Sequence, residues 1–294
     1  MSVLYGHLSG NMDKKRAKVS VIIITLNEEE DIEQCLQSVY EWSDDIHIAD
    51  SNSTDNTVEI AKKYTDNIHT VEEGYHGNWA TIRQWALSTV PLKCEWVLFV
   101  DADEWLTEEL KNEIIQKINS DPDEIGFYIQ FRFIFMNKWI KHGGQYAKVL
   151  RLFKHNKVHC VPDGDGECYV PEGKVGMLKN DFIHQDLKHF STWIDKHNKI
   201  SLMAAERYIE MKEGKIDEAI AGRSWLGKVW DRVPLLLRPF LMFFYVYIIK
   251  FGFLDGKEGL IYHLHHAFWY NLLIYTKVKE IEFRQAKELK DKRL

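Results

Sequence analysis

The stretch KVSVIIITLNEEEDIEQCLQSVYEWSDDIHIAD, residues 18–50, decides the fold of this chain. It opens with a short run rich in Val and Ile, which is typical of a strand buried on both faces. Ile32, Leu36 and Val39 then share one helical face, behind glutamates that suit the positive end of a helix dipole. A second short strand is predicted at 46–50. Strand, helix and strand in this order form the unit of a parallel sheet.

The same alternation continues along the first 120 residues. The Ser- and Asn-rich turn at 51–57 can cap the helix that follows it. Further strands are predicted at 67–72 and 96–104, and further helices at 58–64, 78–87 and 107–118. This pattern indicates an α/β fold with a mostly parallel sheet and helices on both faces. Such sheets bind their ligands at the carboxyl ends of the strands.

The rest of the chain has a different pattern and divides it into regions. Beyond residue 120 we predict strand-like stretches, a Gly- and Asp-rich loop at 161–173 and a helix at 189–212. The resulting regions are a polar tail (1–18), a ligand-binding domain (19–222, with halves 19–120 and 121–222) and a C-terminal helical region (223–294). With 45% hydrophobic residues, the chain is not a disordered one. The start lacks the apolar run of a secretory signal and the four cysteines form no CxxC, so we expect a cytosolic protein with reduced thiols.

The C-terminal region is basic and aromatic, whereas the rest of the chain is acidic. Residues 223–294 hold 13 Lys and Arg against 7 Asp and Glu, although the whole chain has a net charge of −6. The charge-free run at 239–249 is shorter than the roughly 20 residues of a membrane-spanning helix. We therefore predict interfacial or re-entrant helices on a membrane surface with anionic lipids, and no nucleic-acid partner. A buried helical subdomain or an oligomer interface is the alternative.

Two carboxylates end the strand predicted at 96–104. Asp101 and Asp103 would lie on one side of an extended segment, because side chains alternate along a strand. Two carboxylates at the end of a buried strand repel each other unless a positive charge lies between them. Oxygen ligands suit Mg²⁺ or Mn²⁺, so the pair predicts a metal site. The alternative is the solvated start of the next helix.

Asp50 ends the second predicted strand. An acid at this position suits a ribose hydroxyl or a base edge in open α/β nucleotide folds. The alternative is a cap for the turn that follows. Neither GxGxxG nor GxxxxGK[ST] follows the first strand, which disfavours a hydride-transfer enzyme and a P-loop kinase.

The motifs VSVIIITLNEEEDIEQCLQSV, ADSNSTDNT, NWATIRQWAL and WVLFVDADEWLTEEL together resemble the nucleotide-sugar half of family 2 glycosyltransferases. Downstream, KWIKHGGQYAKVLRLFKHNKV and FIHQDLKHFSTWIDKHNKISLMAAERY resemble a bacterial subgroup that transfers sugars to lipopolysaccharide core, capsule or exopolysaccharide lipid precursors. The resemblance implies the GT-A fold, a Rossmann-like sheet with flanking helices, followed here by a membrane-associating helical region. It implies an inverting hexosyltransferase on the cytoplasmic face of the inner membrane, either peripheral or re-entrant.

The resemblance also implies ligands and residue roles. The donor would be a nucleoside-diphosphate sugar, usually UDP-linked, the acceptor a lipid-linked or lipopolysaccharide-type molecule, and the cofactor Mg²⁺ or Mn²⁺. The implied donor-site residues are Thr25, Asn27 and Glu28 in the nucleotide pocket, Asp50 at the base or ribose, and Arg83 near the diphosphate. The implied metal-site residues are Asp101 and Asp103 in the DxD motif, with Asp103 the first choice of direct ligand, and His184 near the metal or acceptor.

An inverting transfer needs a base that takes the acceptor proton. The subgroup usually has a His-Glu pair soon after the RLF strand, and this chain has Gly166 and Glu167 there. Glu167 keeps the carboxylate and is our first choice, with Asp165 and Asp163 as competitors. The alternative is an acidic surface loop.

Two other functions fit part of the pattern. A nucleotidyltransferase also uses paired acids and a metal, but it usually has a Gly-rich basic loop where this chain has LNEEED. A non-catalytic membrane scaffold with a degenerate nucleotide site is favoured by Gly166 and disfavoured by the intact DAD. Donor-dependent metal binding separates the scaffold from the enzymes, and release of nucleoside diphosphate separates the two enzymes.

Overall fold

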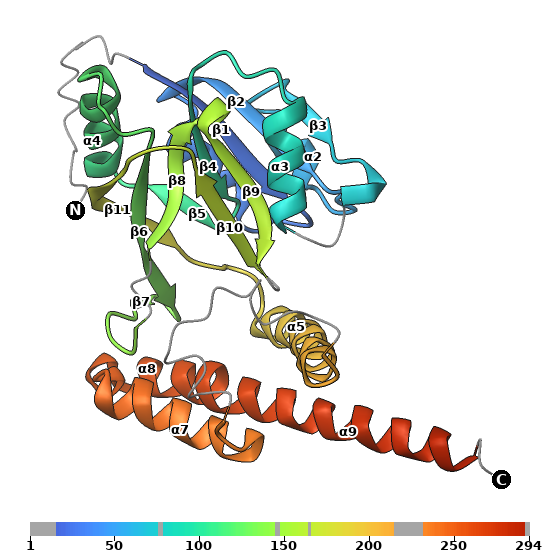
Figure 1. Cartoon of the computed structure of the whole chain (residues 1–294). Helices are drawn as coiled ribbons and strands as arrows, with labels where there is room; N and C mark the ends of the chain where they lie inside the picture. Colours follow the sequence, from blue (N-terminus) through green and yellow to red (C-terminus); the bar gives the residue numbers. More distant parts are fainter. Residues whose placement is uncertain (1–15, 76–78, 145–147, 164–165, 215–231, 292–294) are drawn as a thin grey trace, which may run out of the picture.

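The first half of the molecule is a parallel sheet with helices on both of its faces (Figure 1). The computed structural model describes residues 16–75, 79–144, 148–163, 166–214 and 232–291. Strand β1 (Ala17–Thr25) lies between β2 (Ser43–Asp50) and β4 (Trp96–Asp101) and is parallel to both. Strand β3 (Ile68–Thr70) pairs in parallel with the other side of β2. The helices of this half are α1 (Ile32–Val39), α2 (Thr57–Ala61), α3 (Trp79–Thr89) and α4 (Glu108–Asn119). The predicted strand–helix alternation is thus confirmed.

The second half continues the same sheet with mixed strand directions. Strand β8 pairs antiparallel with β4 and β6, β11 runs parallel to β6, and β5 runs antiparallel to β11. These strands are β5 (Glu104–Leu106), β6 (Gly126–Phe135), β7 (Lys138–Trp139), β8 (Lys148–Lys154) and β11 (Val175–His184). The loop predicted at 161–173 is wrong. It is mostly a hairpin of β9 (Val158–Asp163) and β10 (Gly166–Pro171), because backbone pairing outweighs the turn-like composition of this segment.

The sheet is buried on both faces, as the apolar run in β1 predicts. Val21 and Ile23 pack into a cluster with residues of α1 and α4, whereas Ile22 and Ile24 pack into a second cluster with residues of α3. Each of these four side chains is at most 4% exposed. Burial of a Val or Ile side chain contributes about 1.5–3 kcal/mol, so β1 is a main source of the stability of the domain.

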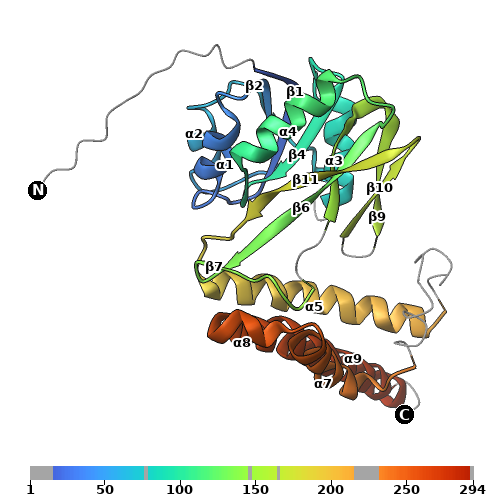
Figure 2. The same cartoon turned by 90° about the vertical axis from the view of Figure 1, so that its left-hand side faces the viewer.

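The C-terminal helices form a separate layer below the sheet (Figures 1 and 2). They are α5 (Phe190–Lys212), α7 (Arg238–Phe244) with a π-helical turn (Tyr245–Ile249), α8 (Gly256–His263) with a second π-helical turn (Leu264–Trp269), and α9 (Tyr270–Asp291). Helices α5 and α9 pack through Ala205, Ile209 and Val278. The helix predicted at 189–212 and the helical character predicted for 223–294 are both confirmed in the described residues. The tail expected at 1–18 lies almost entirely outside them, as do the first residues of the region expected at 223–294.

Contacts from the sheet hold this layer in place. The ring of Phe133 in β6 lies 4.9 Å from that of Tyr262 in α8. The imidazole Nδ1 of His142 lies 2.8 Å from a carboxylate oxygen of Asp255, whose other oxygen accepts the backbone N–H of His142. The sheet and the helical layer therefore share an interface.

No single helix in the described ranges is long and apolar enough to cross a membrane. The helical segments Leu235–Ile249 and Gly252–Lys287, bent by 71° at the break between them, pass that test as a pair by length and composition.

Candidate functional site

The loops after β1 and β2 are joined through Asp50. Its carboxylate accepts hydrogen bonds from the Thr25 hydroxyl at 2.8 Å and from the backbone N–H and hydroxyl of Ser53 at 2.9 and 2.6 Å. Asp50 is 4% exposed, and Thr25 is fully buried. Asp50 therefore acts as the turn cap that the sequence offered as an alternative. Its role at a ribose or base stays a prediction.

Asn27 and Glu28 follow in the same loop. Asn27 has a left-handed backbone (φ 56°), and its side-chain oxygen accepts the backbone N–H of Thr54 at 2.8 Å, so it also ties the two loops together. Glu28 forms an ion pair of 2.6 Å with Lys188. Burial raises the pKa of Glu28 to about 8, although Lys188 acts in the opposite direction.

Asp101 is held by two arginines. Its two carboxylate oxygens contact the guanidinium groups of Arg83 at 2.5 Å and Arg151 at 2.6 Å, and both arginine side chains are nearly buried. Burial by itself would raise the pKa of Asp101, but the charges of Arg151 and Arg83 outweigh it and hold the pKa below its usual range. The positive charge predicted beside this carboxylate is thus supplied by guanidinium groups.

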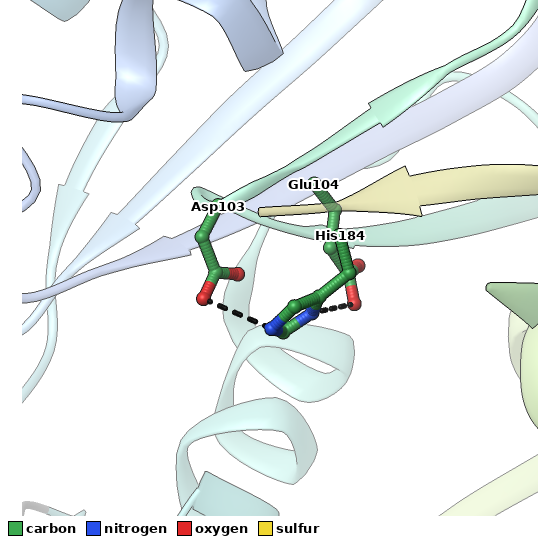
Figure 3. Close-up of side chains that lie close together, drawn as sticks. All are labelled: Asp103, Glu104 and His184. Carbon is green, nitrogen blue, oxygen red and sulfur yellow. Dashed lines mark hydrogen bonds and ion pairs between the residues drawn. The ribbon is translucent and has the colours of Figure 1, made fainter. Parts of the chain in front are cut away.

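Asp103 does not share an extended segment with Asp101, so that prediction is wrong. Strand β4 ends at Asp101, and Ala102 and Asp103 form a turn before β5. The turn directs Asp103 toward His184, at the end of β11, with 3.5 Å between Oδ2 and Nε2. Figure 3 shows the His184 imidazole lying between the carboxylates of Asp103 and Glu104.

Asp103, Glu104 and His184 form a candidate metal-binding group. One ligand atom from each residue lies within 4.8 Å of the other two. Glu104 is only 2% exposed, and its Oε1 lies 3.4 Å from His184 Nδ1. Glu104 can therefore orient the imidazole through Nδ1. The opposite ring nitrogen, Nε2, and the Asp103 carboxylate could then bind a metal ion. Burial would lower the pKa of His184, but Asp103 and Glu104 raise it to about 9.

A small cavity gathers two of the five predicted donor-site residues and all three predicted metal-site residues, whereas Thr25, Asn27 and Asp50 do not line it. Its volume is about 190 Å³, and Glu28, Arg83, Asp101, Asp103 and His184 line it. Trp79, Ile24, Ala102 and Lys196 complete its wall. The cavity lies at the carboxyl ends of β1 and β4, where ligands of parallel sheets bind.

A larger cavity of about 570 Å³ lies between the sheet and the helical layer. The end of β6, the segment after β11 and helix α5 supply most of its wall, and the C-terminal helices add Tyr262 and His266. Trp193 and His197 stack with ring centroids 3.6 Å apart, and Tyr262 and His266 stack at 5.2 Å. Burial lowers the pKa of His197, and it lowers that of His266 to about 4. These four rings therefore form an aromatic part of the wall, beside the charged side chains of Asp103, Asp186, Lys188 and Lys196.

The two cavities meet at a shared wall. Asp103, His184 and Lys196 line both of them. A molecule bound in the larger cavity can therefore approach a molecule bound in the smaller one beside the candidate metal group.

The structure describes the backbone of two of the three candidate bases but none of their side chains. The backbone of Glu167 pairs with Pro162 in the β9–β10 hairpin, but its side chain lies outside the description, and so does that of Asp163. Asp165 lies outside the described residues. Their roles stay predictions.

Sequence reasoning missed four charged residues near the cavities. Glu104 directly follows the DAD motif, and Arg151 lies in the predicted strand KVLRLF, so both had a local signal. Lys188 and Lys196 lie in a polar segment where nothing local distinguishes them from other lysines.

Comparisons with known proteins show which family this chain resembles. The family model described as "Glycosyl transferase family 2" matches residues 20–169. An uncharacterized glycosyltransferase of Rickettsia prowazekii is 32% identical over 85% of this chain and 83% of its own. The lipopolysaccharide core biosynthesis glycosyltransferase LpsC of Rhizobium meliloti is 28% identical over 65% of this chain and 72% of its own.

Solved structures also resemble part of the chain. Glucosyl-3-phosphoglycerate synthase from Mycobacterium tuberculosis, solved in complex with Mn²⁺, UDP and glucosyl-3-phosphoglycerate, is 19% identical, with a TM-score of 0.33. That match covers 40% of this chain and 44% of the synthase chain.

Proposed function

The chain belongs to glycosyl transferase family 2, and we propose that it moves a sugar from a UDP-sugar to a lipid-linked or lipopolysaccharide-type acceptor. The observation that carries this proposal is the meeting of two cavities at Asp103 and His184. The smaller cavity would take the donor and the larger one the acceptor. Membership of the family also argues against the nucleotidyltransferase and scaffold alternatives.

A divalent cation, Mg²⁺ or Mn²⁺, would be held by Asp103 and His184 together with the donor diphosphate. Carboxylate and imidazole are suitable ligands for such an ion, and Mg²⁺ usually binds through few protein ligands plus substrate phosphates. When bound, the metal supplies charge neutralisation for the diphosphate leaving group. Glu104 would orient the His184 ring. Arg83 and Arg151 would hold the Asp101 carboxylate in place in the wall of the smaller cavity.

The acceptor is proposed from the larger cavity and the similarity to LpsC, whose name assigns it to lipopolysaccharide core biosynthesis. The partly exposed aromatic rings of this wall, Trp193 among them, offer apolar surface for a sugar ring, and the buried Tyr262 supports the wall from behind. Tyr262 and His266 come from the helical layer, so this layer would complete the acceptor site. Glu167, with Asp165 as its competitor, remains the proposed base for inversion.

Nucleotide binding provides the direct test. We expect UDP or one UDP-sugar, with Mn²⁺ or Mg²⁺, to raise the melting temperature of the purified protein. A ligand at 100 times its Kd adds about 2.7 kcal/mol to the free energy of unfolding. We expect EDTA to abolish most of this shift, because the diphosphate would lose its metal. Absence of a shift with every nucleotide and metal would contradict the proposed donor site.

We also propose that the protein lies on the cytoplasmic face of the inner membrane through an apolar face of the helical layer. The residues proposed to form this apolar face are Phe240, Phe244, Ile249, Phe251 and Leu254, each 53–58% exposed. Lys250 and Lys257 are exposed beside it, and residues 232–254 contain no acid. Half-exposed apolar rings flanked by cations suit the interface of an anionic bilayer.

Replacing Phe244, Ile249 and Leu254 together by serine should weaken binding to vesicles roughly 100-fold, because each half-exposed side chain yields about 1 kcal/mol on burial. Co-sedimentation with phosphatidylcholine vesicles, with and without phosphatidylglycerol, measures this binding. Phe283→Ser is the matched control, since Phe283 is 71% exposed on α9 outside the apolar face. Equal sedimentation of the triple variant and the control would contradict the membrane proposal.

A further inference from the structure

Lys196 stands where the two cavities meet. It belongs to the first turns of α5, and it lines both cavities together with Asp103 and His184. Its side chain is exposed, so the ammonium group can reach a ligand from the common opening.

The other cations around the smaller cavity already have acidic partners. Arg83 and Arg151 contact Asp101. Lys188 forms its ion pair with Glu28. Lys196, in contrast, makes no ion pair and no hydrogen bond with any residue that the structure describes. An ammonium group of this kind is suited to an anionic ligand, because lysine binds phosphate as a point charge.

The position of Lys196 indicates which anion it meets. In the proposed transfer, the acceptor oxygen in the larger cavity forms a bond to the anomeric carbon. The bond from that carbon to the β-phosphate oxygen breaks, and its electron pair stays on the diphosphate while the base takes the acceptor proton. The β-phosphate must therefore lie where the cavities meet, beside the residues that line both.

We propose that Lys196 binds the β-phosphate of the UDP-sugar and neutralises the charge that develops on the leaving oxygen. This inference rests on the proposed function and adds to it a second positive charge, contributed by α5, in the wall that Lys196 shares with Asp103 and His184. It also gives α5 a part in donor binding as well as in the acceptor wall.

Calorimetric titration of UDP and UMP in the presence of Mn²⁺ tests the inference. In Lys196→Ala, the Kd for UDP should rise roughly 10- to 100-fold, as expected for loss of a charged hydrogen bond, while the Kd for UMP stays unchanged. Lys196→Arg should retain most of the UDP affinity, since it keeps the charge. Lys199→Ala is the matched control, because Lys199 is an exposed lysine one turn along α5 and is absent from the walls of both cavities.

Three results would overturn the inference. Unchanged UDP affinity in Lys196→Ala would remove its contact with the β-phosphate, and a rise only in the KM for the acceptor would place its contact on an acceptor phosphate. Equal losses for UDP and UMP would indicate general damage to the site. If the wild-type protein binds UDP with Mn²⁺, each of these results leaves the proposed function standing. Failure of the wild-type protein to bind UDP would instead overturn the proposed function, and this inference with it.

Discussion

Asp103→Ala should lower kcat/KM for sugar transfer roughly 1000-fold, because a bound metal contributes several kcal/mol of charge stabilisation and each 1.4 kcal/mol is a factor of ten. Asp103 is the carboxylate that faces both cavities and lies 3.5 Å from His184. Its loss leaves His184 as the one remaining member of the proposed pair of protein ligands. The melting temperature without ligand should fall less than in Asp101→Ala, because Asp103 loses one partly exposed ion pair, to His184, whereas Asp101 has two buried arginine partners.

Asp101→Ala is the informative comparison, because it separates metal binding from structural support. Removal of Asp101 leaves the guanidinium groups of Arg83 and Arg151 without this carboxylate, and breaking a buried ion pair costs about 3–5 kcal/mol. We therefore expect Asp101→Ala to lower the melting temperature by several degrees, whereas Asp103→Ala abolishes the metal-dependent shift with UDP. Thermal unfolding and kinetics on both variants measure the two effects.

Two outcomes would contradict this assignment of roles. Normal turnover by Asp103→Ala would remove Asp103 from the metal site. If Asp101→Ala unfolded at the wild-type temperature and lost only the metal-dependent shift, Asp101 would be the metal ligand, as the DxD pattern suggested. The variant Asp195→Ala, which removes an exposed acid on α5 outside both cavities, controls for the change in net charge.

Glu167→Gln should lower kcat by about 10²–10⁴-fold, the range typical of a lost general base. The substitution keeps the size of the side chain and removes its ability to take the acceptor proton. Binding of UDP with Mn²⁺ should persist, because the proposed donor residues lie on other strands. Initial rates of UDP release, combined with calorimetry of UDP, separate catalysis from binding.

Asp165→Asn and Asp163→Asn are the matched controls for Glu167, since each removes one carboxylate from the same hairpin region. If Glu167→Gln turns over normally and one of these variants is inactive, that residue is the base. If all three variants are active, the base lies outside residues 163–167, and the acids of this segment have no part in catalysis.

The sequence alone determined the parallel strands of the sheet and the helices that cover them. The apolar run of β1 and the one-sided pattern of α1 are local signals, since a residue's face in a strand or helix follows from its position along the chain. The polar residues at the ends of β1, β2 and β4 could be located for the same reason. The β9–β10 hairpin was missed because its composition is typical of a loop and its pairing depends on a partner strand.

Only the tertiary structure decided which charges meet. The arginine on Asp101 that sequence reasoning missed lies 50 residues away, and the histidine beside Glu104 lies 80 residues away. The turn at Ala102 and Asp103 separates two acids that an extended strand would have placed side by side. The acceptor cavity needs Tyr262 and His266 from the helical layer. Periodicity is read along the chain, whereas ion pairs and cavities depend on distances between segments that come together only on folding.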